Sequence, residues 1–207
     1  MRSDAPSLMP VFRSRHQADL LTVLFLHPDD DHTTTDLAAR LGIPLTTAHR
    51  ELSRLEAAGL LTGRQVGRAR LLRANTGHRA FAPLARLLLV TFGPHVVITE
   101  EFTGLPRVST VVLYGSWAAR YDGVDGPAPA DVDVLVVGTP QRADVYAAAE
   151  RAEARLSIPV NPVVRSPARW TAGDDPLIAT IQTGPHLVLQ DNDDHTPDHN
   201  DQANSTG

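Results

Sequence analysis

The spacing of apolar residues predicts two helices near the start of the chain. Ser14 and Gln17 have the arrangement of a capping box, and apolar residues then recur at helical spacing until His27-Pro28. Each of the threonines at 33–35 can cap a second, shorter helix, and Gly42 is expected to end it. The segment therefore reads as a helix, a turn and a second helix.

A third helix is predicted in the stretch LTTAHRELSRLEAAGLL. At about 100° per residue, its apolar side is formed by Ala48, Leu52, Leu55 and Gly59. The opposite side is formed by Thr46, Arg50, Ser53 and Arg54. Such a face suits the DNA major groove, where Arg reaches guanine edges and Thr or Ser reaches phosphates, but an ordinary solvated helix looks the same. Both interpretations stay open at this point.

A basic hairpin and an apolar helix are predicted next. The segment TGRQVGRARLLR has two glycines that bracket a turn and four arginines along its length. The helix expected from Phe81 to Phe92 contains Pro83 near its start and needs a partner for its apolar surface. A second copy of the chain is our leading interpretation, and the second domain of the same chain is the alternative. Gly93-Pro94 marks the boundary between the two domains.

The second half begins with a strand that leads into a Gly-Ser turn. Val108–Tyr114 is rich in β-branched residues and is followed directly by Gly115-Ser116, after which Trp117 can begin a helix. Further on, Asp131 and Asp133 precede an apolar strand, and the alternation of side chains puts both carboxylates on one face. Two adjacent carboxylates repel each other unless a divalent cation such as Mg²⁺ neutralises them. The spacing therefore predicts a metal site.

Composition excludes several kinds of chemistry. All 19 basic residues are arginine, so lysine Schiff bases and a phosphate-loop lysine are ruled out. Cysteine is absent, which rules out disulfides, thiolate nucleophiles and cysteine metal sites. The uninterrupted apolar runs are far shorter than the roughly 20 residues that cross a bilayer, and no signal peptide is apparent. We therefore expect a cytoplasmic protein with no membrane partner.

Charge divides the chain into two parts. Residues 1–90 contain 12 Arg and 8 acidic residues, whereas residues 91–207 contain 7 Arg and 16 acidic residues. The positive charge is densest over residues 45–73, which is where contacts to phosphates are expected. Two domains with different partners follow from this asymmetry.

Helix, short helix, turn, third helix and basic hairpin occur in the order typical of winged helix-turn-helix proteins. Over residues 12–76 the chain resembles regulators of the ArsR and MarR type, most specifically in AARLGIPLTTAHRELSRLEAAGLL. The resemblance implies a homodimer that binds double-stranded DNA. The residues expected to meet DNA are Thr46, Thr47, His49, Arg50, Ser53, Arg54, Arg64, Arg68 and Arg70.

Metal sensing, known in part of that family, is not implied, because the cysteine pair of its metal-sensing members is missing. His27, His32 and the aspartates at 29–31 offer a replacement metal cluster. A solvated acidic loop is the preferred interpretation of the same residues.

The string YGSWAARYDGVDGPAPADVDVLVVG resembles the signature of DNA polymerase β-like nucleotidyltransferases, with the likeness extending over residues 94–190. It implies that Gly115 and Ser116 bind a nucleoside triphosphate and that Asp131 and Asp133 bind Mg²⁺ or Mn²⁺. The family's third carboxylate is replaced by Asn161.

Two further assignments near this site have alternatives. Arg120 is a candidate phosphate ligand, or else an ion-pair partner of Asp122 or Asp125. Asp174 and Asp175 are either substitute carboxylates or the N-cap of a helix.

The sequence thus predicts an α/β (α+β) protein of two domains. The expected parts are a flexible start (1–11), a winged helix-turn-helix (12–76), a connecting or dimerisation helix (77–93), a nucleotidyltransferase-like domain with a small mixed sheet (94–190) and a disordered acidic tail (191–207). The expected function is transcription regulation, with the second domain as a nucleotide and Mg²⁺ sensor or modifier. The alternatives are an active nucleotidyltransferase acting on a small molecule or a protein hydroxyl, and a partner-binding protein.

Overall fold

A computed structural model describes residues 11–173 and 175–191. They form two compact units, and the chain passes between them more than once. The first unit contains the described residues up to 97 together with 120–130, and the second contains 98–119 with the described residues from 131 onward. The two flanking segments predicted to be flexible or disordered lie outside the described residues, apart from Val11 and Asp191.

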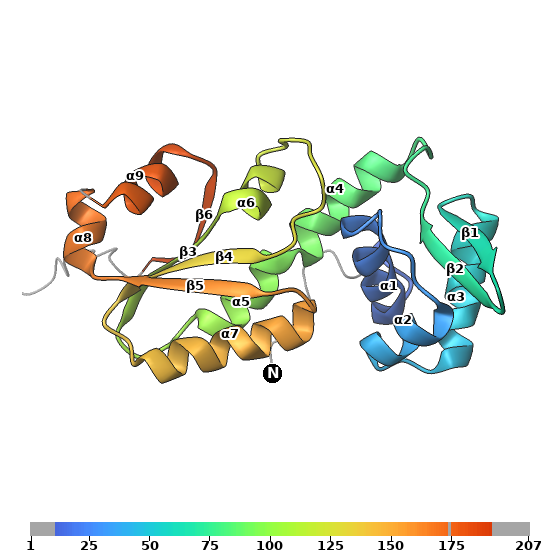
Figure 1. The fold of residues 1–207 in the computed structure, drawn as a ribbon, viewed down its shortest axis with the longest axis horizontal. Helices are drawn as coiled ribbons and strands as arrows, with labels where there is room; N and C mark the ends of the chain where they lie inside the picture. Colours follow the sequence, from blue (N-terminus) through green and yellow to red (C-terminus); the bar gives the residue numbers. More distant parts are fainter. Residues whose placement is uncertain (1–10, 174, 192–207) are drawn as a thin grey trace, which may run out of the picture. The chain divides into compact units, whose positions relative to one another are not determined.

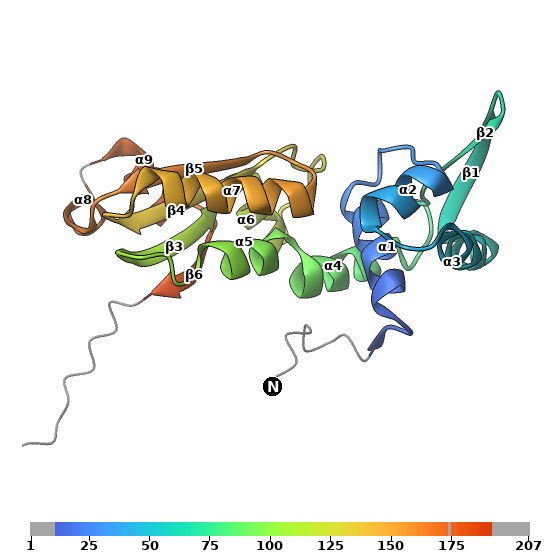
Figure 2. The same ribbon diagram turned by 90° about the horizontal axis from the view of Figure 1, so that it is seen from below.

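The first unit is a winged helix-turn-helix (Figure 1). Its elements are the helices α1 (Arg15–Leu26), α2 (Thr34–Leu41) and α3 (Leu45–Ala57), the strands β1 (Leu61–Val66) and β2 (Ala69–Ala74), and the helix α4 (Phe81–Phe92). The strands pair as an antiparallel hairpin, the wing, which extends away from the helices (Figure 2). Its two-residue turn begins at Gly67, whose φ of 58° suits a hairpin turn.

The predicted caps explain where the first two helices begin and end. The Ser14 and Thr33 side chains accept hydrogen bonds from the backbone N–H groups of Gln17 and Asp36. Gly42 ends α2 with a φ of 62°, in the left-handed region that glycine adopts without strain. The prediction for α3 was wrong at its end: the helix stops at Ala57, so Gly59 belongs to the following turn rather than to the apolar face.

Helix α4 packs on α1 within its own unit. Leu88 is fully buried in the same core as Leu20 and Leu24 of α1. Aromatic pairs reinforce this contact: the rings of Phe25 and Phe81 lie 5.3 Å apart between centroids. The apolar stripe of α4 is therefore covered by α1, a partner that neither sequence-based alternative included. This packing removes the argument that the stripe requires a second copy of the chain.

Helix α4 is followed, after a break at Gly93, by α5 (Pro94–Phe102). Together, Phe81–Phe102 form the one stretch among the described residues that is long and apolar enough to cross a bilayer by length and composition. The break at Gly93 interrupts it, and Leu88, Ile98 and Phe102 are fully buried inside the protein. One such stretch is weak evidence of a membrane span.

The second unit contains a four-stranded mixed sheet. Its elements are β3 (Val108–Tyr114), α6 (Gly115–Tyr121), β4 (Val132–Gly138), α7 (Arg142–Leu156), β5 (Val160–Arg165), α8 (Pro167–Ala172), α9 (Pro176–Thr183) and β6 (His186–Asp191). The strand order is β5-β4-β3-β6, with β4 and β5 parallel and the other pairs antiparallel. Helix α7 packs along β5 (Figure 1). The small mixed sheet expected from the sequence is present.

One face of this sheet is covered by α8 and α9. Ile181 packs with Val112, Leu135 and Val137 of the central strands, and Trp170 lies against the same cluster. Asp175 caps α9 by accepting a hydrogen bond from the Leu177 backbone N–H, as predicted, and is not a substitute metal ligand. Asp191 was predicted to begin a disordered tail but is the last residue of β6, where it pairs with Thr110. Asp174 lies outside the described residues.

Candidate nucleic-acid interface and carboxylate site

Helix α3, the predicted DNA-contacting helix, presents its polar face to solvent. Thr46, His49, Arg50, Ser53 and Arg54 are exposed, and Thr47 is partly buried. The opposite face is buried in the winged-helix core through Ala48, Leu52 and Leu55. The structure therefore brings the predicted DNA-contacting residues of this helix together on one accessible surface.

A buried carboxylate beneath this surface was missed in the sequence. Glu51 lies on the inner side of α3 and is only 4% exposed. Its Oε1 lies 2.9 Å from Arg54 Nη1, 3.5 Å from Arg50 Nε and 4.0 Å from Arg13 Nη2. A Glu between Arg50 and Leu52 gives no sign of burial by itself, although its helical position next to the apolar stripe does.

The arginines of the wing differ in what they contact. Arg64 pairs with Asp31 of the loop before α2, and Arg70 pairs with Glu56 near the end of α3. Arg68, at the turn, is exposed and forms no ion pair with any described residue. Arg68 is therefore the most readily available of the three for a phosphate.

The residues considered as a replacement metal cluster do not form one. Arg64 donates a hydrogen bond to the carboxylate of Asp31, which lowers the pKa of Asp31. This carboxylate is therefore already paired with an arginine. Burial lowers the pKa of both His27 and His32. Across the described part of the chain, no three His, Asp or Glu side chains are grouped so that they could bind a metal.

The second unit brings Asp131, Asp133 and Asn161 together. Asp133 of β4 is paired in register with Asn161 of the parallel strand β5 and with Tyr114 of β3. Asp131 lies just before β4, and its Oδ2 accepts a hydrogen bond of 2.8 Å from Asn161 Nδ2. Val132, between the two aspartates, is fully buried on the other face. Adjacent strands therefore position the two carboxylates and the amide predicted from the sequence.

The electrostatics of this cluster are unfavourable for two negative charges. Burial and the nearby charge of Asp131 raise the pKa of Asp133, and the amide of Asn161 only partly offsets this. Burial, Asp133 and Asp131 also raise the pKa of Tyr114. A bound cation would relieve the repulsion between the carboxylates.

Gly115 lies against Asp133. Its φ is 72°, and a Cβ added at this position would lie 2.5 Å from Asp133 Oδ2. The neighbouring Ser116 is exposed. Helix α6 begins at Gly115, so the Gly-Ser pair lies inside the first turn rather than before it, which corrects the predicted start at Trp117.

Arg120 contacts the loop that follows α6, which neither alternative drawn from the sequence included. Its guanidinium donates hydrogen bonds to the carbonyl oxygens of Val124 and Pro127, the latter at 2.6 Å. Gly126 leaves room for it, because a Cβ there would lie 2.6 Å from Arg120 Nη2. Arg120 therefore organises the loop that follows α6, and it forms no ion pair with Asp122 or Asp125 within the described residues.

By donor type, the carboxylate site fits one hard divalent cation. Two carboxylates and an amide oxygen are ligands that Mg²⁺ accepts, with water completing the shell. The amide of Asn161 points its nitrogen at Asp131, so it would have to turn over to offer its oxygen. The two carboxylates and one amide do not provide the third acid that would bind a second cation.

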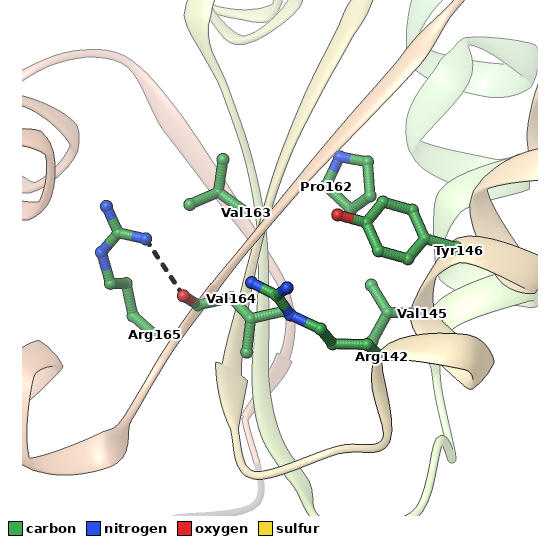
Figure 3. Close-up of a pocket in the computed structure, with 7 residues that line it drawn as sticks. All are labelled: Arg142, Val145, Tyr146, Pro162, Val163, Val164 and Arg165. Carbon is green, nitrogen blue, oxygen red and sulfur yellow. Dashed lines mark hydrogen bonds between the residues drawn. The ribbon is translucent and has the colours of Figure 1, made fainter.

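A cavity of about 180 Å³ lies elsewhere, between the first turn of α7 and the edge strand β5 (Figure 3). Arg142, Val145 and Tyr146 line it from α7, and residues 162–165 line it from β5. Arg165 is already engaged, because it donates to the Val164 carbonyl and pairs with Asp175. None of the aspartates of the carboxylate site lines this cavity, and its volume is below the roughly 300 Å³ of ordinary ligand pockets.

Comparison with known families identifies the amino-terminal part. Residues 14–64 match a family model described as a helix-turn-helix domain. The match covers α1 to the start of the wing, and it supports a DNA-binding regulator of the helix-turn-helix class. No curated protein matches the chain.

Solved structures share limited likeness with the chain. MarR from E. coli in its apo form is 20% identical, with 47% of this chain and 72% of MarR covered and a TM-score of 0.35. Reduced HlyU from Vibrio cholerae is 17% identical, with 40% of this chain and 82% of HlyU covered and a TM-score of 0.33. MepR, a transcription regulator of the Staphylococcus aureus multidrug efflux pump MepA, is 21% identical, with 40% of this chain and 60% of MepR covered and a TM-score of 0.34. Values this low do not establish more than the helix-turn-helix match itself.

Proposed function

We propose that this protein regulates transcription by inserting α3 into the major groove of double-stranded DNA while the wing contacts the adjacent backbone. The observation that carries this proposal is the exposed polar face of α3 within the matched helix-turn-helix region. An arginine-bearing helix with a basic hairpin beside it suits this docking geometry. A cytoplasmic location follows from the same function.

Each exposed side chain has a role that follows from its chemistry. Arg50 and Arg54 are proposed to read guanine edges, and His49 lies on the same face. The hydroxyls of Thr46, Thr47 and Ser53 are proposed to bond phosphates or base edges. Arg64, Arg68 and Arg70 of the wing are proposed to contact the minor groove or its phosphates.

A homodimer is part of this proposal. Operators with two half-sites about one helical turn apart match proteins with two-fold symmetry. Because α1 packs on α4, the apolar stripe of α4 does not by itself identify the dimer contact. Light scattering of the full chain, alone and with DNA, measures the assembly.

Mobility-shift titrations at several salt concentrations test the DNA interface. Arg50→Ala or Arg54→Ala is expected to weaken binding by about 1 to 3 kcal/mol and to alter the preferred sequence. Arg68→Ala is expected to weaken binding to all sequences and to flatten the salt dependence. Arg142→Ala, which removes an exposed arginine from the second unit, is the matched control. If the α3 and wing variants all bind like the control, the interface is elsewhere.

For the second unit, we propose a sensor that binds one Mg²⁺ (or Mn²⁺) at Asp131, Asp133 and Asn161, with a nucleoside triphosphate at Gly115 and Ser116. Support comes from the paired register of Asp133 and Asn161, from the raised pKa of Asp133 and from the contact of Gly115 with that carboxylate. The amide in place of a third acid favours sensing over the alternative, two-cation nucleotidyl transfer to a hydroxyl. Arg120 is bonded to the carbonyls of Val124 and Pro127, so we leave it out of the proposed nucleotide contacts.

Thermal unfolding tests the sensor. Mg²⁺ with a non-hydrolysable nucleoside triphosphate is expected to raise the melting temperature of the wild type, because a ligand of the native state stabilises it by mass action. Asp133→Ala should abolish the shift, whereas Glu150→Gln, an exposed position on α7, should retain it. In a separate assay with an ordinary nucleoside triphosphate and Mg²⁺, pyrophosphate release by the wild type would favour the enzyme. A wild type whose melting temperature does not respond to ligand would exclude the sensor.

A further inference from the structure

The arginines of the recognition helix share one buried carboxylate. Three guanidinium groups converge on Glu51 Oε1, of which the Arg54 group donates a hydrogen bond of 2.9 Å. The side chains of Arg13, Arg50 and Arg54 are 61%, 60% and 48% exposed, whereas that of Glu51 is 6% exposed. The cations therefore lie at the surface, and the anion lies beneath them.

This carboxylate depends on its arginines more than an ordinary surface acid does. Glu51 Oε2 is buried and has no hydrogen-bond partner among the described residues. A buried charge that loses one of its partners has its desolvation less well compensated. Moving Arg54 away removes the 2.9 Å hydrogen bond and leaves Glu51 with only the longer contacts to Arg50 and Arg13, which is costly even though Arg54 itself is half exposed.

The wing arginines are not restrained in the same way. Arg64 and Arg70 pair with Asp31 and Glu56, whose side chains are 26% and 30% exposed. Water can solvate these two carboxylates when their pairs open, so the cost of opening is small. Among the proposed DNA contacts, the restraint is thus confined to α3.

We propose that Glu51 is a specificity-determining residue of the DNA interface, which keeps Arg50 and Arg54 from binding DNA of arbitrary sequence. This inference rests on the proposed DNA-binding function. The contact between an arginine and a phosphate is screened by counterions. It therefore compensates poorly for taking Arg50 or Arg54 away from the buried carboxylate. A guanine edge offers two directed hydrogen bonds, which can compensate for it. The carboxylate thereby penalises phosphate-only contacts more than contacts to bases.

The test compares wild type and Glu51→Gln on a 30-base-pair duplex of mixed sequence by fluorescence anisotropy over a range of salt concentrations. The variant is expected to bind about five- to tenfold more tightly near 0.1 M salt, and its plot of log affinity against log salt should steepen by about 0.9 for each additional phosphate that the protein neutralises. Asp36→Asn is the matched control, because it removes one negative charge from the same unit at an exposed position that forms no ion pair with a described residue.

Further variants separate the restraint from general effects. Adding Arg50→Gln and Arg54→Gln to Glu51→Gln should remove the increase in affinity, since the freed arginines produce it. Selection from a random DNA library should return less sharply defined sites with Glu51→Gln than with the wild type. Circular dichroism melting of each variant verifies that it is folded; if Glu51→Gln is unfolded, Glu51→Asp, whose shorter side chain withdraws the carboxylate from Arg54, replaces it with the same expected direction.

The outcomes distinguish the inference from the function on which it rests. Equal affinity and equal salt slope for wild type and folded Glu51 variants would overturn the restraint while leaving DNA binding intact. An increase of the same size in Asp36→Asn would also overturn it, because net charge alone would then explain the effect. If the wild type and all variants fail to bind any DNA, the proposed function itself is wrong.

Discussion

At the scale of single residues, Gly115 is required by backbone conformation and by packing. Its φ of 72° lies in the left-handed region, and the position of a Cβ would overlap Asp133 Oδ2. Gly104 of the same unit has a φ of 81° but open space around it. Alanine substitutions at these two glycines therefore distinguish the free-energy cost of the left-handed backbone from the cost of the clash with Asp133.

The first prediction uses this pair. Gly104→Ala should destabilise the protein by about 1 to 2 kcal/mol, the cost of a left-handed L-residue. Gly115→Ala should cost about 1 to 3 kcal/mol more, because the methyl group must displace a carboxylate. Urea unfolding measures both. Equal losses would show that Asp133 moves aside freely, and Asp133→Ala should restore part of the stability of Gly115→Ala.

A second prediction concerns pH. Because burial and Asp131 raise the pKa of Asp133, the folded chain binds this proton more tightly than the unfolded chain. That contribution to stability is present at low pH and is lost as pH rises through the raised pKa. Asp133→Asn should therefore be more stable than the wild type near neutral pH, and its advantage should vanish below about pH 4, the range of an unfolded carboxyl.

Glu101 serves as a control, because its pKa is shifted in the opposite direction to that of Asp133. Burial alone would raise the pKa of this carboxyl, but hydrogen bonds from Arg151 and Arg155 outweigh it and lower the pKa. Glu101→Gln should therefore destabilise the protein near neutral pH, and the loss should shrink as pH falls. Urea midpoints measured from pH 3 to pH 8 test both variants, and parallel curves for Asp133→Asn and the wild type would contradict the assignment.

At the scale of elements, the pairing of α4 with α1 determines how the winged helix is stabilised. Leu88 is fully buried between these helices, whereas Val90, two residues later, is 43% exposed. Large apolar side chains buried in this way contribute both transfer free energy and packing. Helix α4 is thus a core element of the first unit.

The third prediction follows from this contrast. Leu88→Ala should destabilise the first unit by about 2 to 5 kcal/mol through the cavity it leaves. Val90→Ala should change stability by less than about 0.5 kcal/mol, as is usual for an exposed position. Differential scanning calorimetry of the full chain gives both values. A small loss for Leu88→Ala together with a change in oligomeric state for Val90→Ala would show that α4 has a partner outside its own unit.

At the scale of the whole molecule, the chain returns to its first unit after entering the second. Tyr121 lies at the end of α6, and its hydroxyl donates a 3.1 Å hydrogen bond to the Leu89 carbonyl and contacts His95. Arg86 in turn donates to the carbonyl of Arg120. Residues 120–130 are thereby part of the folded winged-helix unit.

The fourth prediction tests this return. Tyr121→Phe should cost about 0.5 to 1.5 kcal/mol in the first unit, the net value of one hydrogen bond. Tyr146→Phe, at an exposed tyrosine in the second unit, should have no measurable effect. A fragment that ends at Val97 should melt below the corresponding transition of the full chain, and an unchanged melting temperature would mean that residues 120–130 do not stabilise the unit.

Local sequence was sufficient for features that neighbouring residues control. Ser14, Thr33 and Gly42 were recognisable as caps because a cap depends on hydrogen bonds and backbone angles within one turn. The alternation of Asp131, Val132 and Asp133 predicted their faces, because side chains in any strand alternate. Asn161, in contrast, was selected through the resemblance to nucleotidyltransferases, whose third carboxylate lies on a later strand.

Tertiary structure decided which groups meet across the chain. Three contacts illustrate this: α4 packs on α1, Arg120 bonds to its own loop and Tyr121 bonds to Leu89. In each case many other residues of the same chemical type could have served as the partner. Their sequences specify an apolar stripe, a cation and a hydroxyl, but not the acceptor. Glu51 shows the same limit most clearly: its burial follows from the helix around it, whereas the convergence of Arg13 from another segment depends on packing. A contact between distant segments is selected by the burial free energy of the whole unit, which no local pattern contains.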